Sequence, residues 1–359
     1  MGTSPLLDRY KGIIDASLIE QIYEVARSLA SLRVLHINTT ARGGGVAEIL
    51  HKLLPLMEEL GIKHDWKVIS LDEASGYFTA RLVDMLQGYD TGEFPEQEKQ
   101  VFLEKLRLPP EQAQVVTLGI DPFRIKNRFL PKARGMQVLS SCGIDPARPL
   151  ITQVSRFGVW KNPWQVIDIY RQVKQQLPSA QLALVGALEA KDDIKAQEIL
   201  TDLQQHAVHG DPDIHLLSDP TIITHEAVNA FQRYSSVILQ RSIREGFGLT
   251  VTEAMWKNQP VIGTCVTGLQ MQISHGSNGY LVDDTETAAA YTLKLLQDRE
   301  LWKELGENAY ETVRQRFLFP TMILDYLKAL ARAQTRPSAL IQPEIVSITI
   351  SASGKELAA

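Results

Sequence analysis

Between residues 149 and 334, short apolar runs alternate with longer amphipathic stretches, and this alternation restricts the possible folds more than any other feature of the chain. The short runs are rich in β-branched residues, which is typical of buried strands, and the longer stretches carry apolar residues at helical spacing. Strands that alternate with helices form a parallel sheet with helices on both faces. We therefore predict an α/β, doubly wound, Rossmann-like domain in this half of the chain.

The strands predicted in this half are the runs PLITQVSRF, AQLALVG, DIHLLS, SSVILQRS, PVIGTC and NGYLVDD. The predicted helices cover residues 164–177, 191–207, 224–234, 250–257, 285–297, 299–316 and 320–334. We expect the last of these helices to close the domain.

The first half contains one clear βαβ unit. A strand is predicted over residues 33–38, a helix over 46–61 and a second strand over 64–70. The loop between the first strand and the helix contains three consecutive glycines, Gly43, Gly44 and Gly45. Further along, residues 72–107 are predicted to be mostly helical and residues 113–121 to form another strand.

The first half is short for a doubly wound domain. A βαβ unit takes roughly 30 residues, so residues 33–121 have room for about three strands, whereas a complete doubly wound half carries five or six. We predict an internally shortened N-terminal Rossmann-like domain over residues 1–121, with sheet edges left uncovered. The second domain is predicted over residues 122–334, and residues 335–359 are predicted to be a disordered tail.

Composition excludes several classes of function. The net charge is −5 and no basic stripe is present, so nucleic acid is not an expected partner. No apolar run approaches eighteen residues and no signal peptide is recognisable, which predicts no association with membranes. Cys142 and Cys265 are isolated, as is usual in the reducing cytoplasm. No metal site is predicted, because the histidines lack ligand spacing with acids or cysteines.

The stretch REGFGLTVTE, residues 244–253, joins the strand predicted over 235–242 to the helix predicted over 250–257. Thr250 and Glu253 have the spacing of a capping box, in which the threonine is the N-cap residue and the glutamate reaches back to its amide. A strand, a glycine turn and a helix also direct free backbone amides towards an anion. We predict both a helix start and an anion site here.

Ligands of doubly wound sheets bind beyond the carboxyl ends of the strands. In this chain those ends carry polar or glycine-rich loops, namely Gly43 to Gly45, Arg156 with Lys161, Gly186, and the stretch 244–253. Arginine offers a fork and lysine a point charge for phosphate oxygens, and the amides of Phe247, Gly248, Leu249 and Thr250 suit the same anion. One carboxylate for a ribose, Glu253, and one for a sugar hydroxyl, Glu245, complete a site typical of a nucleotide-sugar.

Several of these motifs resemble the retaining glycosyltransferases of family four, which have the GT-B fold of two Rossmann-like domains. The resemblance is carried by REGFGLTVTE, SRFGVWKNP and ARGGGVAEIL. More narrowly, the runs VLHINTTARGGGVAEILHKLLPLMEELG, GIDPFRIKN, GDPDIH, VNAFQR and LQRSIREGFGLTVTEAMWK resemble trehalose synthases and the related trehalose phosphorylases. The match extends from about Leu18 to Leu330 with one gap.

The resemblance implies a transfer of glucose from a nucleotide-diphosphate glucose to glucose, with retained configuration. It implies that Arg156 and Lys161 bind the donor diphosphate and that Glu245 and Glu253 bind the donor glucose and the ribose. The residues Gly246 to Thr250 are implied to supply amides, and Gly43 to Gly45 to approach the donor from the other domain. Catalysis would rest on positioning and on stabilising the charge of the leaving diphosphate. No protein nucleophile, metal or other cofactor is expected.

The sequence also departs from this family. Segments resembling His-Asp-Pro-Gln and Cys-His-Ile-Asp, which line the acceptor side in the family, are missing from the first half. Gly158 replaces an acid, and Thr267 and Leu269 stand where relatives carry a Gly-Gly-Ile turn. Because threonine tolerates a positive φ poorly, we expect a different loop there.

Two alternatives to the transferase stay open. One is a nucleotide-sugar-binding remnant without transferase activity, and the other is a phosphorylase that uses trehalose and phosphate. An exposed sheet edge in the shortened domain would favour a homodimer.

Overall fold

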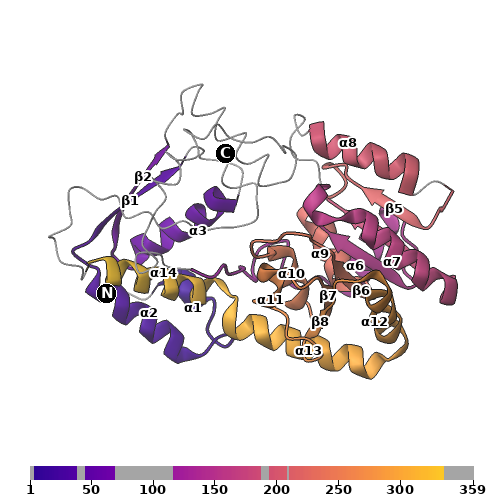
Figure 1. Cartoon of the computed structure of the whole chain (residues 1–359). Coiled ribbons are helices and arrows are strands. Elements are labelled where there is room, and N and C mark those ends of the chain that lie inside the picture. The colour runs from indigo at the N-terminus through magenta and orange to yellow at the C-terminus, as the bar shows by residue number, and fades with distance from the viewer. Residues whose placement is uncertain (1–3, 39–44, 69–115, 187–193, 208–209, 335–359) are drawn as a thin grey trace. The chain divides into compact units, whose positions relative to one another are not determined.

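The computed structural model describes residues 4–38, 45–68, 116–186, 194–207 and 210–334 (Figure 1). The chain divides into two compact units, one formed by residues up to Gly119 together with those from Phe317 on, the other by Ile120–Arg316. Among the described residues, no helix combines the length and the apolar character needed to cross a membrane.

The larger unit contains a six-stranded sheet with the order β5-β4-β3-β6-β7-β8. Every neighbouring pair of strands is parallel. The strands are β3 (Leu150–Val154), β4 (Gln181–Val185), β5 (Ile214–Leu217), β6 (Val237–Gln240), β7 (Val261–Gly263) and β8 (Gly279–Leu281). The order along the chain reverses between β3 and β6, which is the switch point of a doubly wound sheet. All six predicted strands and the α/β class are confirmed.

Helices cover both faces of this sheet. On one face, α6 (Lys132–Ser141) packs against α9 (His225–Tyr234), and both share a core with alternate residues of β3 and β4. On the other, α7 (Pro163–Gln176) and α12 (Thr285–Gln297) pack together. The remaining elements are η2 (Val159–Lys161), α8 (Ile194–Asp202), η3 (Leu203–Ala207), α10 (Leu249–Met255), α11 (Thr267–Gln270) and α13 (Arg299–Arg316). The sequence analysis assigned neither α6 nor α11.

In the part of the smaller unit that the structure describes, two strands form a parallel sheet. β1 (Arg33–Asn38) and β2 (Lys63–Val68) pair in register from end to end, and α3 (Gly45–Glu59) connects them. The predicted βαβ unit is therefore confirmed. Two shorter N-terminal helices, α1 (Pro5–Asp8) and α2 (Ala16–Ser28), precede it.

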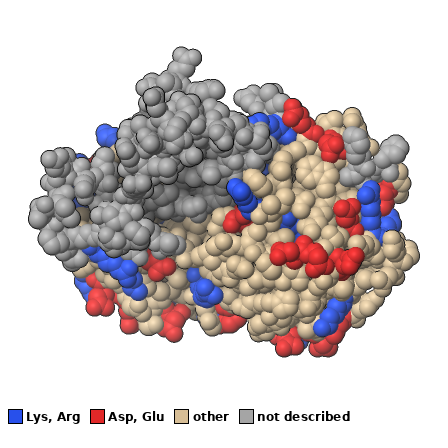
Figure 2. All heavy atoms as spheres, viewed as in Figure 1, with Lys and Arg blue, Asp and Glu red and all other residues tan. Residues whose placement is uncertain are grey.

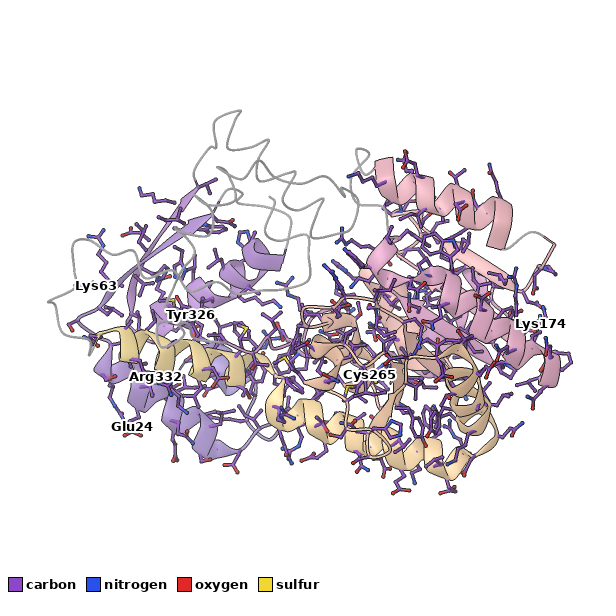
Figure 3. The ribbon with its side chains drawn as sticks, viewed as in Figure 1. Glu24, Lys63, Lys174, Cys265, Tyr326 and Arg332 are labelled. Atoms are coloured by element: carbon purple, nitrogen blue, oxygen red, sulfur yellow. The ribbon has the colours of Figure 1, made fainter. Side chains whose placement is uncertain are left out.

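The last helix, α14 (Phe319–Gln334), packs against α2 in the smaller unit. Tyr326 of α14 is labelled in Figure 3. Its ring stacks on that of His36 in β1, with the ring centroids 6.2 Å apart. The sequence analysis placed this helix at the end of the second domain, and the domain boundaries proposed there stay a prediction. The chain thus returns to its first unit after completing the larger one.

The strand predicted over residues 113–121 was wrong in its described part. Residues 116–119 belong to no helix or strand, although Val116, Leu118 and Ile120 are buried. A Cβ on Gly119 would lie 2.5 Å from the Leu318 carbonyl oxygen, so the segment packs against another backbone. Ile120 forms a single isolated bridge, and the alternating apolar residues otherwise reflect this packing and not a ladder of paired strand residues. The helical stretch 72–107 and the tail 335–359 lie outside the described residues.

The surface of the described residues carries charges of both signs. Figure 2 shows Lys and Arg side chains interspersed with Asp and Glu side chains over the face turned to the viewer. This distribution agrees with the modest net charge of −5. On that face, the residues that the structure describes form no extended basic stripe.

Candidate active site at the carboxyl edge of the larger sheet

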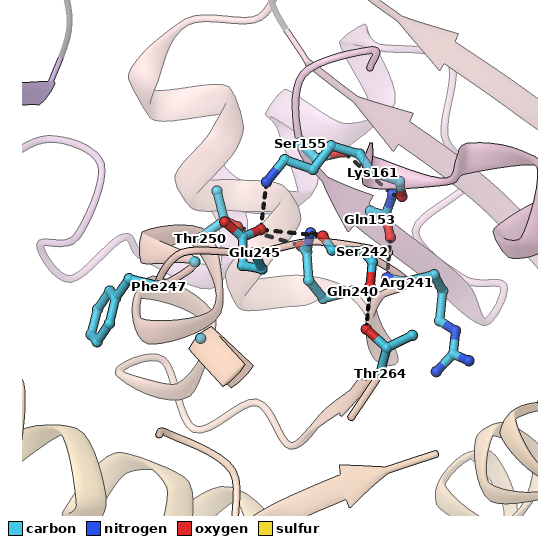
Figure 4. A network of polar contacts seen from close by, with 12 residues as sticks. Gln153, Ser155, Lys161, Gln240, Arg241, Ser242, Glu245, Phe247, Thr250 and Thr264 are labelled. Carbon is cyan, nitrogen blue, oxygen red and sulfur yellow. Dashed lines mark hydrogen bonds and ion pairs between the residues drawn. The ribbon is translucent and has the colours of Figure 1, made fainter. Parts of the chain in front are cut away.

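The central feature of the site is an ion pair between Lys161 and Glu245. Lys161 ends η2, which follows β3, and Glu245 follows β6, so the two come from the strands that flank the switch point. The Lys161 ammonium contacts the Glu245 Oε2 atom (Figure 4), and the side chains are 16% and 1% exposed. The Ser242 hydroxyl donates to the same oxygen over 3.2 Å.

The second carboxylate oxygen of Glu245 has different surroundings. Glu245 Oε1 is buried and accepts no hydrogen bond from any residue that the structure describes. A buried acceptor left without a donor costs about 1–3 kcal/mol. Such a cost is compatible with a stable fold at a site where a ligand hydroxyl supplies the donor. Glu245 therefore has one oxygen occupied by protein and one available for a ligand.

Two buried carboxamides hold the loops that carry this ion pair. Gln153 of β3 accepts from the Arg241 amide over 2.8 Å and donates to the Lys161 carbonyl over 2.9 Å. Gln240 of β6 donates to the Ser242 hydroxyl over 2.8 Å. Because the Ser242 oxygen accepts this bond, its own proton is free to be donated to Glu245. Hydrogen bonds from β3 and β6 therefore hold the Lys161–Glu245 ion pair in place.

Arg241 holds the residues that follow β6 against the segment after β8. Its buried guanidinium donates to the carbonyl oxygens of Val282 and Asp283 over 2.6 and 2.7 Å. Burial lowers its pKa to about 10, so the group keeps its charge at neutral pH. A buried cation that meets backbone carbonyls fixes the path of the chain after β6.

A cation–π contact joins the loop after β3 to the loop after β6. The Arg244 guanidinium lies 4.5 Å from the centroid of the Trp160 ring. The Ile243 amide donates to the Trp160 carbonyl over 2.8 Å. These contacts link η2 to the residues immediately before Glu245.

The capping box predicted at Thr250 and Glu253 was wrong. Helix α10 begins at Leu249, and its N-cap residue is Gly248, with a φ of 89° and no side-chain cap from the described residues. A Cβ at Gly248 would lie 3.2 Å from Glu245 Cγ. The Thr250 hydroxyl donates instead to Gln240, over 3.4 Å. Glycine is favoured because any other residue would be strained at this φ, and its Cβ would press on the side chains of Leu269 and Glu245.

The carbonyl groups of the glycine turn face the segment 266–272. The Gly268 amide donates to the Glu245 carbonyl over 3.2 Å. Gln272, which is 1% exposed, donates through Nε2 to the carbonyl oxygens of Phe247 and Gly248 over 2.5 and 3.4 Å. In a trans peptide the amide points away from the carbonyl. The amides of Gly246, Gly248 and Leu249 therefore point away from that segment.

The two segments approach each other backbone to backbone. A Cβ at Gly268 would lie 2.6 Å from the Glu245 carbonyl oxygen and 2.7 Å from the Phe247 nitrogen. Thr267 begins α11, and the positive φ values of non-glycine residues in the described part of the chain are those of Asn162 and Asn258. The threonine at position 267 is thus accommodated without strain, because the close approach falls on Gly268.

Glu253 lies on α10 with a buried carboxylate. Gln232 of α9 donates to its Oε2 atom over 3.1 Å. The Lys126 ammonium lies 3.4 Å from its Oε1 atom, and the two side chains are 33% and 8% exposed. Sequence reasoning missed Lys126 and Gln232, although both belong to runs, GIDPFRIKN and VNAFQR, that carried the family resemblance.

The remaining predicted residues fall into three groups. Gly186 directly follows β4, and a Cβ there would lie 2.0 Å from the Ser155 carbonyl oxygen, so glycine permits the close approach of the β3 and β4 ends. Arg156 is half-buried in the loop after β3. Gly43 and Gly44 lie outside the described residues, and Gly45 begins α3 in the other unit. Among the described residues, no cluster of three or more His, Cys, Asp or Glu side chains is suited to hold a metal.

Two known families match the chain. Residues 140–312 match the family described as glycosyl transferases group 1, and residues 36–157 match the trehalose synthase N-terminal domain. The trehalose synthases of Thermococcus litoralis and Rubrobacter xylanophilus are each 34% identical to this chain. The first match covers 92% of this chain and 97% of the relative, and the second covers 90% and 96%. A trehalose phosphorylase of Pleurotus pulmonarius is 32% identical over 46% of this chain and 24% of its own length.

Solved structures match at the level of the fold. Anabaena HepE in complex with UDP and glucose has a TM-score of 0.61 and 15% identity, and the match covers 84% of this chain and 99% of that one. Sucrose-phosphate synthase of Thermosynechococcus elongatus has a TM-score of 0.52 and 19% identity over 88% of this chain and 79% of that one. These neighbours are GT-B glycosyltransferases, which confirms the predicted fold class.

The match to the Thermococcus litoralis protein also supports the predicted internal deletion. The alignment extends over 403 residues but uses 92% of this 359-residue chain, which is about 330 residues. About 70 aligned positions of the relative therefore have no counterpart in this chain. This gap is predicted to lie in the first half of the chain, where segments resembling those of the acceptor side in the family are missing.

Proposed function

Because the chain belongs to the trehalose synthase family of group 1 glycosyltransferases, we propose that it transfers glucose from a nucleotide-diphosphate glucose to glucose. The product would be trehalose, formed with retention of configuration. The observation that carries this proposal is the Lys161–Glu245 pair at the switch point, with Glu245 Oε1 buried and not bonded by the described residues. A donor sugar hydroxyl is a suitable partner for that oxygen.

In the proposed complex the donor extends along the carboxyl edge of the sheet. Lys161 and Arg156 face the diphosphate, and the outward amides of Gly246, Gly248 and Leu249 bind sugar and phosphate oxygens. Glu253 accepts the ribose hydroxyls. Gly186 allows the β3 loop to approach the end of β4, which shapes the site next to Arg156. The family resemblance also implies that Gly43 to Gly45 bind the donor, and Gly43 and Gly44 lie outside the described residues.

The proposed chemistry needs no group beyond these residues. When the bond between the glucose anomeric carbon and the diphosphate breaks, negative charge develops on the leaving phosphate oxygen. Lys161, Arg156 and the turn amides are preorganised donors for that charge. The acceptor hydroxyl attacks from the face that the diphosphate leaves and passes its proton to the departing phosphate oxygen, which retains the configuration.

Product formation tests this proposal directly. Purified protein is mixed with glucose and uridine-, adenosine- or guanosine-diphosphate glucose, and NMR follows the anomeric protons. An α,α-linked disaccharide in one or more tubes supports the transferase and identifies the base. Glu245→Gln should abolish it, whereas Lys174→Met should not, since Lys174 forms its ion pairs with Asp211 and Asp213 away from the site.

The alternative is a nucleotide-sugar-binding protein without transferase activity. The observation in its favour is the absence of about 70 aligned positions, which the sequence analysis assigns to the acceptor side. Donor binding in calorimetry, together with no disaccharide in any NMR tube, would favour it over the transferase. Phosphorylase activity is tested in the same assay by adding trehalose and phosphate, and it would appear as glucose phosphate released only with phosphate.

We further propose a cytoplasmic location and a homodimer. Cys142 and Cys265 are free thiols, which agrees with a reducing compartment. Leu35 and Val68 on the two-stranded sheet are 55% and 50% exposed, and apolar side chains of this kind are suited to an interface. Light scattering tests the second proposal, and a monomeric mass would contradict it.

A further inference from the structure

Lys257 is a buried lysine directly beyond α10, and the mechanism above does not use it. Its ammonium donates to Gln232 Oε1 over 2.8 Å, to the Glu253 carbonyl over 2.9 Å and to Asn127 Oδ1 over 3.3 Å. An ammonium has three donors and no acceptor, so three contacts satisfy it completely. All three acceptors are neutral oxygens. The pKa of Lys257 is lowered to about 7, chiefly by burial.

The contact with Lys257 determines how Gln232 is oriented. Its amide oxygen faces the ammonium, so its amide nitrogen faces the opposite side of the side chain. That nitrogen donates to the Thr250 carbonyl and to Glu253 Oε2, each over 3.1 Å. A reversed carboxamide would place its oxygen against the carboxylate and its NH₂ group against the ammonium. Lys257 therefore selects the orientation in which Gln232 binds Glu253.

We propose that Lys257 is a positioning residue for donor recognition, which acts through Gln232 to hold the Glu253 carboxylate in the orientation that accepts the two ribose hydroxyls. The inference rests on the proposed function, because it takes Glu253 as the ribose-binding residue. It makes Lys257 and Gln232 determinants of specificity for ribonucleotides over nucleotides without the 2′ and 3′ hydroxyls.

One of the three contacts, that between Lys257 and Asn127, also ties the site to the segment before α6. Asn127 is 4% exposed and donates to the Asp121 carbonyl over 3.0 Å, and its neighbour Lys126 contacts the other oxygen of Glu253. Glu253 is thus held from two directions, through Gln232 at Oε2 and by Lys126 at Oε1. Burying a lysine without a carboxylate partner is costly, and orienting Glu253 is a role that an apolar residue at this position would not fill.

The test compares ribonucleotides with their dideoxy counterparts. Isothermal titration calorimetry measures the Kd of the full chain for UDP, ADP and GDP and for the 2′,3′-dideoxy form of the base that binds best. Wild type is expected to prefer the ribose form by about tenfold or more, since two hydroxyls bond a carboxylate. In Lys257→Met and Gln232→Met this preference should fall to less than about threefold, with the Kd of the dideoxy form unchanged.

Gln259→Met is the matched control. Gln259 is also a buried glutamine, 1% exposed, and donates to the Arg233 carbonyl over 2.9 Å, but it has no contact with Glu253. It should keep the ribose preference of wild type. A preference retained in folded Lys257→Met or Gln232→Met overturns the inference, as does its loss in Gln259→Met.

The other outcomes separate this inference from the function on which it rests. If wild type binds none of the three nucleotides, the proposed function fails first. If it binds them but does not distinguish the dideoxy form, donor binding stands and the role given to Lys257 falls. Circular dichroism checks the fold of each variant, and if Lys257→Met does not fold, Gln232→Met decides alone.

Discussion

Gln272 donates a hydrogen bond to the carbonyl oxygen of Phe247, although 25 residues separate them in the chain. The acceptor side of the same carboxamide receives the Thr252 hydroxyl over 2.6 Å. One buried side chain thus connects α11, the glycine turn and the first turns of α10. Through these bonds it determines which way the peptide groups of the turn face.

Replacing Gln272 should weaken diphosphate binding and leave nucleoside binding unchanged. In Gln272→Met the carbonyls of Phe247 and Gly248 lose a donor, and the amides on the opposite side lose their fixed direction. We expect the Kd for the nucleoside diphosphate to rise about tenfold, which is about 1.4 kcal/mol. Calorimetry with the diphosphate and with the nucleoside measures the two effects, and equal losses for both would contradict the role given to the turn amides.

Removing the Lys161 charge should lower turnover more than binding. Lys161→Met deletes the cation that we propose for the leaving diphosphate, and it leaves Glu245 without its ion-pair partner. We expect kcat to fall by about a hundredfold or more, as when one preorganised donor is removed from other active sites. Initial rates of disaccharide formation measure it. A kcat within a factor of about five of that of Lys174→Met would show that Lys161 is not catalytic.

Stability should rise with pH between about 7 and 10.5 because of Lys257. Its pKa is lowered from 10.5 to about 7 in the folded chain, so in this window the unfolded chain binds more protons than the folded one. The free energy of unfolding then increases with pH, by at most about 1.4 kcal/mol per pH unit for one group. Below pH 7 both states are protonated and this slope disappears.

Urea denaturation at a series of pH values measures that slope. Lys257→Met lacks the titrating group, so the difference between the free energies of unfolding of wild type and variant isolates its contribution. Gln259→Met keeps Lys257 and should follow wild type. Parallel curves for wild type and Lys257→Met between pH 7 and 10 would show that the buried lysine keeps an ordinary pKa.

A methyl group at Gly186 should destabilise the chain more than one at Gly210. Gly210 has a φ of 82° with open space around it, so Gly210→Ala meets only backbone strain, about 1–2 kcal/mol. In Gly186→Ala the new Cβ would meet the Ser155 carbonyl at 2.0 Å, and the cost of displacing backbone is about 3 kcal/mol. Urea midpoints compare the two variants, and the reverse order would mean that β3 and β4 separate easily.

The strands of the larger unit were predictable because a strand buried on both faces leaves a local signal. Leu182 and Val237 lie in short apolar runs, Ile151 lies in a buried run that includes Thr152 and Gln153, and glycine or polar loops follow these runs. The segment around Leu118 was not predictable, since burial against another backbone produces the same alternation as a strand. The short helix around Gly268 was missed because four residues carry no helical period.

The sequence predicted the charged residues of the site, but it did not predict the buried residues that hold them in place. Glu245 and Lys161 stand in recognisable motifs beside glycine turns, and the structure brings them into contact. Lys257 is invisible in the sequence, because a lysine at the end of a helix is normally exposed and its partner Asn127 lies 130 residues away. The predicted cap at Thr250 was wrong because residue spacing alone does not show which acceptor a hydroxyl meets. The Thr250 hydroxyl donates to Gln240 of β6 instead.

The groups that shape the Glu245 region are the carboxamides of Gln153, Gln240 and Gln272, each about 1% exposed. A carboxamide both donates and accepts but does not ionise across the physiological pH range. These three side chains therefore support the proposed sugar and diphosphate positions without adding to the charge of Arg241, the buried cation that holds the chain after β6. Adding or removing a polyanionic ligand changes the local field, yet none of these three side chains has to exchange a proton in response. We therefore expect the three carboxamides to contribute to binding of the proposed donor through their fixed positions. The charged side chains that face the ligand would respond to its charge.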